Sequence, residues 1–165
     1  MRALSFVAVL AGALVLGSCE SISSRFESTD RVVYADPETW SERMVPTIVL
    51  GEVQGASVDI DDRTVTEAES VLTSLLQIAN ATAPQRANGE PATLELTVIL
   101  RQRRFVQRFS ERFSTTVELE LHEADGTEVA RAVRTRVGDT GFMSYRFLLQ
   151  ELERALELVL DRRLR

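Results

Sequence analysis

The chain has 165 residues, which is enough for one domain with a short extension. Its formal net charge is −6, and all 19 basic residues are arginines because the sequence contains no lysine. This composition excludes lysine-dependent phosphate loops and Schiff-base chemistry. With one cysteine and one histidine, it also excludes an intrachain disulfide and a zinc site built from several Cys and His ligands. We therefore expect neither a metal nor another cofactor.

Residues 1–18 have the pattern of a secretory leader. Arg2 precedes an apolar run from Ala3 to Leu16, which is shorter than the ~20 residues that a membrane-spanning helix needs. Small residues follow the run. The pattern predicts a signal peptide over residues 1–18.

The tetrad Leu16-Gly17-Ser18-Cys19 ends this leader. It resembles the lipobox of bacterial lipoproteins, in which the cysteine thiol receives a diacylglyceryl group, the leader is cut before the cysteine, and the new amino terminus is acylated. The resemblance implies that Cys19 is the lipid attachment site. Glu20 stands where the family's inner-membrane retention signal usually has aspartate, so the resemblance also implies the outer membrane, at its periplasmic face. The alternative is an ordinary secreted protein with a free thiol at Cys19.

After the cysteine the chain is polar and rich in serine. We predict a lipidated cysteine and flexible tether over residues 19–30, followed by a single domain over 31–165. Cleavage after residue 18 removes one arginine from a chain of charge −6, so the mature chain carries −7. An acidic domain is poorly suited to nucleic acid, and we expect no nucleic-acid partner.

Caps, turns and apolar periods predict the element order β-α-β-β-β-α after one short helix. The predicted elements are, in chain order, a short helix from Asp36 to Pro46, a strand over 47–53, a helix over 64–80 that a capping box at Thr64–Glu67 opens, strands over 94–100, 117–121 and 128–137, and a helix from Ser144 to the C-terminus. The two long helices each have one apolar stripe, and the strands over 94–100 and 117–121 alternate strictly between apolar and polar residues. The predicted fold is therefore an α+β two-layer sandwich, with a mostly antiparallel four-stranded sheet and both amphipathic helices on one face.

The register of the last predicted hairpin stays open. Asp125-Gly126 is a strong turn signal. A three-residue loop would set Val129 and Val133 opposite Leu121 and Val117, whereas a two-residue loop would not.

Residues 96–115 carry five arginines and one acid, although the chain as a whole is acidic. Arginine binds phosphates and carboxylates through two parallel hydrogen bonds, and interleaved phenylalanines add apolar contact. This segment lies at the tip of the predicted central hairpin and predicts a site for lipid head groups or an acidic partner protein. The candidate residues are Arg101, Arg103, Arg104, Phe105, Arg108, Phe109 and Arg112. The alternative is that the arginines pair with Glu118, Glu120 and other acids, while Phe105 and Phe113 cap the core.

Three other motifs offer weaker chemistry. Asp139-Thr140-Gly141 matches the short motif of aspartic proteases, but a single copy near the end of the chain is better explained as a turn. The acids Asp59, Asp61 and Asp62 do not fit a calcium loop and favour a helix start instead. His122 alternates outward on its strand and has no second histidine as partner. We expect no enzymatic activity.

A lipobox, a tether and a small sheet backed by two helices are together similar to the envelope lipoproteins that act as accessory subunits. The order of elements over about residues 46–163 resembles the lipopolysaccharide-assembly lipoprotein, which plugs an outer-membrane barrel, and the auxiliary lipoproteins of lipid-transporting ABC systems. The resemblance implies a non-enzymatic accessory or assembly subunit with an outer-membrane or transport-complex protein as partner. The alternatives are a stand-alone structural lipoprotein or surface antigen and, last, a hydrolase built on Asp139.

Overall fold

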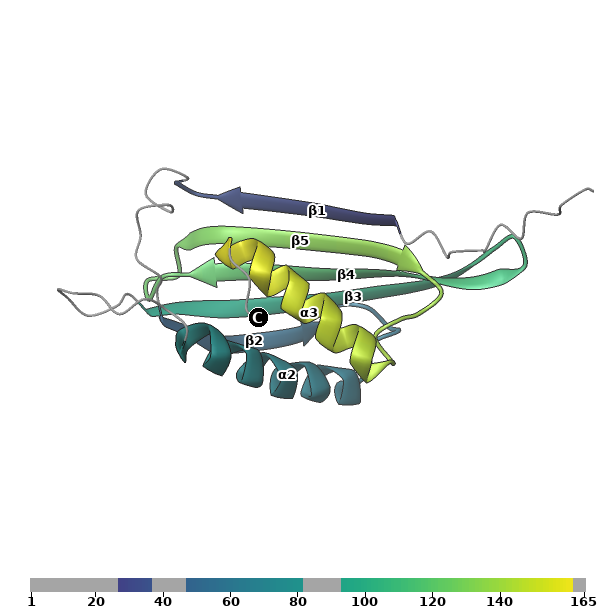
Figure 1. Cartoon of the computed structure of the whole chain (residues 1–165), viewed down its shortest axis with the longest axis horizontal. Coiled ribbons are helices and arrows are strands. Elements are labelled where there is room, and N and C mark those ends of the chain that lie inside the picture. Colours follow the sequence, from purple (N-terminus) through teal and green to yellow (C-terminus); the bar gives the residue numbers. More distant parts are fainter. Residues whose placement is uncertain (1–26, 37–46, 82–92, 162–165) are drawn as a thin grey trace, which may run out of the picture.

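Two helices cover one face of a five-stranded sheet (Figure 1). The computed structural model describes residues 27–36, 47–81 and 93–161. Its elements are β1 Glu27–Tyr34, β2 Thr47–Gly55, α2 Asp62–Ala81, β3 Thr93–Gln107, β4 Ser110–His122, β5 Glu128–Gly138 and α3 Tyr145–Leu160. The strand order is β1-β5-β4-β3-β2, in which β2 and β3 are parallel and all other neighbours are antiparallel. No helix in these ranges is long and apolar enough to cross a membrane.

The α+β class and the placement of both helices on one face are confirmed, but the sheet has five strands and not four. The additional strand is β1, and its first residues, Glu27 to Asp30, fall within the range predicted as tether. They are too polar to show a strand period, and they become a strand because they pair with β5. The short helix predicted from Asp36 to Pro46 lies almost entirely outside the described residues.

The core lies between the helices and one face of the sheet. The alternation in β3 and β4 holds, because every second residue from Leu94 to Leu100 and from Val117 to Leu121 is at most 2% exposed. From α2 the core receives Ala68, Val71, Leu72, Leu75, Leu76 and Ala79, and from α3 it receives Phe147, Leu148, Leu152, Ala155, Leu156 and Val159. No described helix covers the other face of the sheet, which we call the open face.

Helix α2 begins earlier than predicted. Asp61 is its N-terminal cap, and its carboxylate accepts hydrogen bonds from the backbone N–H of Thr64 at 2.8 Å and from the Thr64 hydroxyl at 2.7 Å. These two bonds lower the pKa of Asp61. The capping box predicted at Thr64 is therefore wrong, since Thr64 lies inside the helix and Glu67 pairs with Arg63.

At its other end α2 protects the edge of the sheet. The side-chain amide of Asn80 accepts a hydrogen bond from the N–H of Ile48 at 2.9 Å and donates one to the carbonyl of Ile48 at 2.8 Å. Asn80 thus takes the place that a further strand would occupy beside β2. Unpaired edge groups invite association with other chains, and this contact removes two of them.

The β4–β5 hairpin does not set Val129 and Val133 opposite Leu121 and Val117, so the pairing expected of a three-residue loop is absent. Leu121 lies opposite Ala130 and Val117 lies opposite Arg134, with an irregularity between Leu121 and His122. As a result, Val133 faces the open side opposite Glu118. The side that faces α3 receives Ala130, Ala132, Arg134 and Arg136.

These two arginines meet a buried carboxylate on α3. Glu151 is 2% exposed, and it accepts hydrogen bonds from Nε of Arg134 at 2.7 Å and from Nη1 of Arg136 at 2.5 Å. Arg134 also donates to Asp30 of β1 at 2.6 Å, and the guanidinium of Arg136 lies 5.0 Å from the ring centroid of Phe147. Burial acts to lower the pKa of Arg134, but the hydrogen bonds and charges of Glu151 and Asp30 outweigh it and raise that pKa. The cluster joins α3, β5 and β1.

Replacing Glu151 by alanine leaves two largely buried guanidinium groups without their shared carboxylate. We expect the free energy of unfolding to fall by about 3–5 kcal/mol, the range for breaking a buried ion pair from one side. Urea denaturation followed by circular dichroism measures it, with Gln150→Ala, an exposed position on the same helix, as the control. A loss no larger than that of the control would show that the cluster does not hold α3 to the sheet.

Candidate functional site: the tip of the central hairpin

Strands β3 and β4 run far beyond the rest of the sheet (Figure 1). β2 ends with Gly55 opposite Leu100, and β5 ends with Gly138 opposite Phe113. Residues 105–112 therefore form a two-stranded projection without a neighbouring strand, which we call the hairpin arm. The prediction that the arginine-rich segment lies at the end of a central hairpin agrees with this register.

Gln102 fixes the base of the arm. Although its side chain is polar, it is only 4% exposed. Its amide oxygen accepts a hydrogen bond from the N–H of Phe142 at 2.7 Å, and its amide nitrogen donates to the carbonyl of Asp59 at 3.1 Å. Its backbone N–H donates to the hydroxyl of Ser57 at 2.9 Å. One glutamine thus ties the β2–α2 loop and the β5–α3 loop to the root of the arm, and sequence patterns gave no sign of this role.

The candidate residues divide between the two faces of the hairpin. Arg101, Arg103 and Phe105 alternate along β3 on the open face, and Arg112 lies opposite Phe105 on β4. Arg104 points to the helix side, opposite Phe113. Arg108 and Phe109 form the turn itself, since Gln107 pairs with Ser110.

Ion pairs neutralise only two of these arginines. Arg101 pairs with Glu118, and Arg104 pairs with Glu111. Within the described ranges, Arg103, Arg108 and Arg112 make no ion pair, and the buried Nε of Arg112 has no hydrogen-bond partner. The alternative that the arginines pair with acids therefore holds for Arg101 and Arg104. Three positive charges remain available around the arm.

The apolar residues of the arm are also exposed. Phe109 is 105% exposed relative to a reference residue, and Val106 is 76% exposed. Phe105 is half-buried on the open face, and Phe113 is half-buried beside Gly141 on the helix side. Phe109 and Val106 are thus held outside any core, next to the available arginines. Val106 was not among the residues that the sequence singled out.

The turn has an unusual backbone for its residue types. Arg108 has φ of 49° and Phe109 has φ of 69°, so both occupy the left-handed region. A two-residue hairpin turn of this kind strongly prefers Asn-Gly, because the β-carbon of other residues crowds the backbone at positive φ, whereas glycine has no β-carbon and asparagine tolerates this region. Arg108 and Phe109 are therefore both unfavourable at these turn positions. Strained backbone of this kind often occurs at binding sites.

Replacing the turn by its preferred residues, Arg108→Asn together with Phe109→Gly, relieves this strain. We expect the variant to be more stable than the parent chain by about 1 kcal/mol, because both positions then suit a positive φ. Thermal unfolding monitored by circular dichroism checks this, with Gly126→Ala, which adds strain at φ of 86°, as the opposite case. A variant less stable than the parent would contradict the strain at residues 108 and 109.

The two weaker acidic motifs lie in a turn and at a helix start. Asp139-Thr140-Gly141 lies in the loop between β5 and α3, with Asp139 exposed. A β-carbon on Gly141 would collide with the side chain of Gln102, so glycine is needed there for close packing. Asp61 caps α2, and Asp59 accepts a backbone hydrogen bond from Arg104 at 3.2 Å. Cys19 lies outside the described residues.

The open face also carries a cluster that the sequence did not reveal. Glu120, His122 and Glu128 bring three ligand-type atoms within 4.8 Å of one another. The guanidinium of Arg131 lies among them, 2.8 Å from Glu120 and 2.7 Å from Glu128, and it contacts Glu118 at 3.4 Å. An arginine thus occupies the position that a cation would take, and the cluster is best described as an ion-pair network. His122 faces outward, as its place in the alternation predicted.

On the helix side, a groove of about 720 Å³ separates β1 from α3. It is lined by charges of both signs, among them Asp30, Arg134, Arg154 and Glu157. The Tyr34 hydroxyl crosses it to donate a hydrogen bond to the carbonyl of Leu158 at 3.3 Å. Because its walls already pair with one another, the groove is less suited to a ligand than the arm.

No family model matches the sequence, and no curated protein matches it. Two solved structures share the fold: the PelC dodecamer from Paraburkholderia phytofirmans and a leucine-to-methionine variant of that dodecamer, in different crystal forms. Each is 18% identical, with a TM-score of 0.53 over 83% of this chain and 99% of that chain. A minor lipoprotein from Acinetobacter baumannii aligns at 14% identity and a TM-score of 0.33, over 72% of this chain and 84% of that one. The PelC structures support the α+β architecture alone.

Proposed function

We propose that this chain is a lipid-anchored, non-enzymatic accessory or assembly subunit of an envelope transport or lipopolysaccharide-assembly system at the outer membrane. The observation that carries the proposal is the hairpin arm. It projects from the sheet and presents Phe109, Arg108 and Arg112, with Arg103 at its root, and these arginines make no ion pair in the described part of the chain. Exposed arginine and aromatic side chains are typical of contact surfaces for anionic components.

The leader supports the anchoring half of the proposal. Cleavage before Cys19 and acylation would give the mature chain three fatty chains. Two membrane signals already suffice for stable anchoring, so such a chain would stay at the bilayer. A small domain that is anchored to a membrane can contact other components of that membrane. The arm is suited to such contact because it projects from the sheet and its side chains are exposed.

Acylation of Cys19 is the first expected result. Mass spectrometry of the N-terminal peptide from purified membranes should show a chain that begins at Cys19 and carries a diacylglyceryl group on sulfur and a fatty acyl group on nitrogen. A Cys19→Ala variant should lose both the modification and the cleavage. An unmodified thiol in a membrane-derived peptide would refute the anchor.

The second expected result concerns the arm. A photo-crosslinking phenylalanine analogue placed at position 109 in living cells should capture an envelope component, whereas the same analogue at position 124 in the distant β4–β5 turn should not. Arg103→Glu with Arg108→Glu should abolish the capture, because it reverses two charges without removing an ion pair seen in the structure.

The matched control for this test is Arg31→Glu with Arg146→Glu. It makes the same change in net charge at two exposed positions outside residues 103–112. Capture in the control and not in the arm variant supports docking through the arm. No capture in the unaltered chain would favour a stand-alone structural lipoprotein or surface antigen.

A further inference from the structure

The start of β1 lies at the same end of the molecule as the hairpin arm. Glu27 pairs with Val137, Val137 with Ser114, and Ser114 with Arg103, so these four residues form one row across the sheet. From this row β1 runs away from the arm, and β3 runs into it (Figure 1). The chain that precedes Glu27 therefore enters the sheet beside the root of the arm.

The lengths on the two sides of this row are comparable. The arm reaches about 17 Å from Arg103 to its turn, from the rise of a strand over five residues. Seven residues, 20–26, separate Cys19 from Glu27. Fully extended, that stretch spans about 26 Å. A membrane that holds acyl chains on Cys19 is therefore within reach of Arg108 and Phe109.

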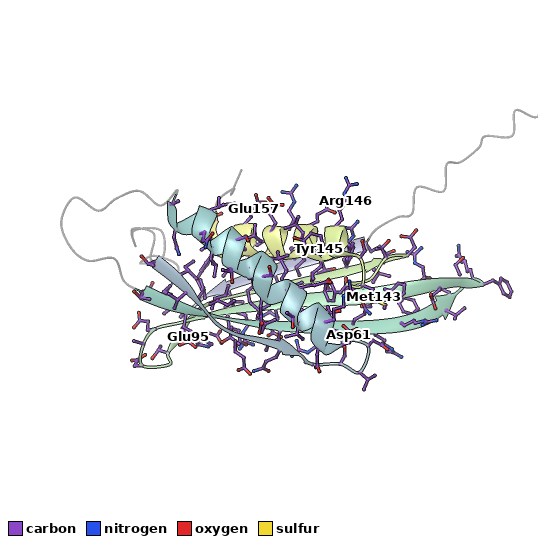
Figure 2. All side chains as sticks on the ribbon, turned by 90° about the horizontal axis from the view of Figure 1, so that it is seen from below. Asp61, Glu95, Met143, Tyr145, Arg146 and Glu157 are labelled. Carbon is purple, nitrogen blue, oxygen red and sulfur yellow. The ribbon has the colours of Figure 1, made fainter. Side chains whose placement is uncertain are left out.

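The same end carries the most exposed apolar side chains that the structure describes. Val58, Val106, Phe109 and Met143 are each between 76% and 105% exposed, and every other large apolar residue described is 56% exposed or less. Val58 and Met143 lie in the two loops that Gln102 ties to the root of the arm. Figure 2 shows Met143 and Asp61 toward the projecting hairpin, and Glu95 toward the opposite end. This asymmetry points to a contact at the arm end with something partly apolar.

The charges of the arm fit an anionic surface. Arg103, Arg108 and Arg112 have no ion pair among the described residues, and a guanidinium binds a phosphate through two parallel hydrogen bonds. Of the acids at this end, Glu111 lies on the arm and is paired with Arg104, whereas Asp59 and Asp61 lie at the root. The tip projects by about two Debye lengths beyond them at physiological ionic strength, so they are largely screened from what it touches. Aromatic and apolar residues beside arginine are typical of peptide segments at the lipid head-group boundary.

We infer that the hairpin arm is a second membrane contact, in which Phe109 and Val106 enter the head-group region, Arg108 and Arg112 bind lipid phosphates, and Arg103 at the root of the arm is attracted to the same anionic surface. The inference rests on the proposed anchor at Cys19 and names the component that the arm binds as the anionic lipid surface of the anchoring membrane. The two contacts together would stand the sheet upright on the bilayer, with the β4–β5 turn pointing away from it.

The experiment uses the acylated protein, purified in detergent and reconstituted into vesicles of phosphatidylethanolamine and phosphatidylglycerol. With Cys19 acylated, Val106→Cys supplies a single thiol for an environment-sensitive fluorophore, and Ala124→Cys in the β4–β5 turn supplies the matched control. A lipid that carries a spin-label quencher on its acyl chain should quench the label at position 106 and leave the label at position 124 unchanged.

Charge and ring are then tested separately. Quenching at position 106 should fall in vesicles of phosphatidylcholine alone. It should fall to the same level when Arg103→Glu and Arg108→Glu are combined. Each arginine removed from an anionic surface lowers the equilibrium constant for docking roughly fivefold. The variant Arg108→Asn with Phe109→Gly should also lose quenching, and because that turn is expected to be more stable, misfolding would not explain the loss.

The possible failures are distinguishable. If the protein floats with the vesicles but the label at position 106 is not quenched, the inference is overturned and the anchor stands. Quenching that persists in both arm variants would overturn it too, as would capture of a protein and no lipid by the crosslinker at position 109. If the protein carries no acyl chains and does not float, the proposed anchor itself fails.

Discussion

The buried carboxylate of Glu151 joins α3, β5 and β1, and no local sequence pattern predicts this contact. It brings Arg134 and Arg136 of β5 under α3, and Arg134 in turn binds Asp30 of β1. Two guanidinium groups in this position are tolerable only because a buried negative charge faces both. Without that charge β5 would present uncompensated cations to the core beneath α3, and Arg134, which also binds Asp30 of β1, would lose its buried partner.

Contacts at the base of the hairpin arm fix its direction relative to the sheet. A two-stranded ribbon is marginally stable by itself, so its direction depends on what fixes its base. Gln102 supplies that fixation through three hydrogen bonds to two loops, and Gly141 allows the close approach that they require. The arm therefore continues the sheet. Its arginines and Phe109 are held in a set direction relative to the first strand.

The parts of the fold that follow a simple period were predictable from the sequence. The alternation in β3 and β4 and the stripes of α2 and α3 placed the core correctly, because burial repeats every second or every three to four residues. β1 was missed because its polar residues are stabilised by distant partners. Glu151 was missed because it interrupts an apolar stripe. The arginine-rich segment was recognised, but only the register shows that Arg101 and Arg104 are neutralised while Arg103, Arg108 and Arg112 are not.

The first strand of the chain pairs with the last, and this sets an order for folding. Asp30 and Arg134 are 104 residues apart in sequence. Contacts across so long a loop form late, since the loop must be closed before the contact can stabilise it. β1 therefore completes the sheet only after β3, β4 and β5 have assembled, and until then residues 27–34 are an unpaired extension of the growing core. On the proposed lipid anchor, these eight residues would lengthen the link between Cys19 and the domain until the last strand is paired.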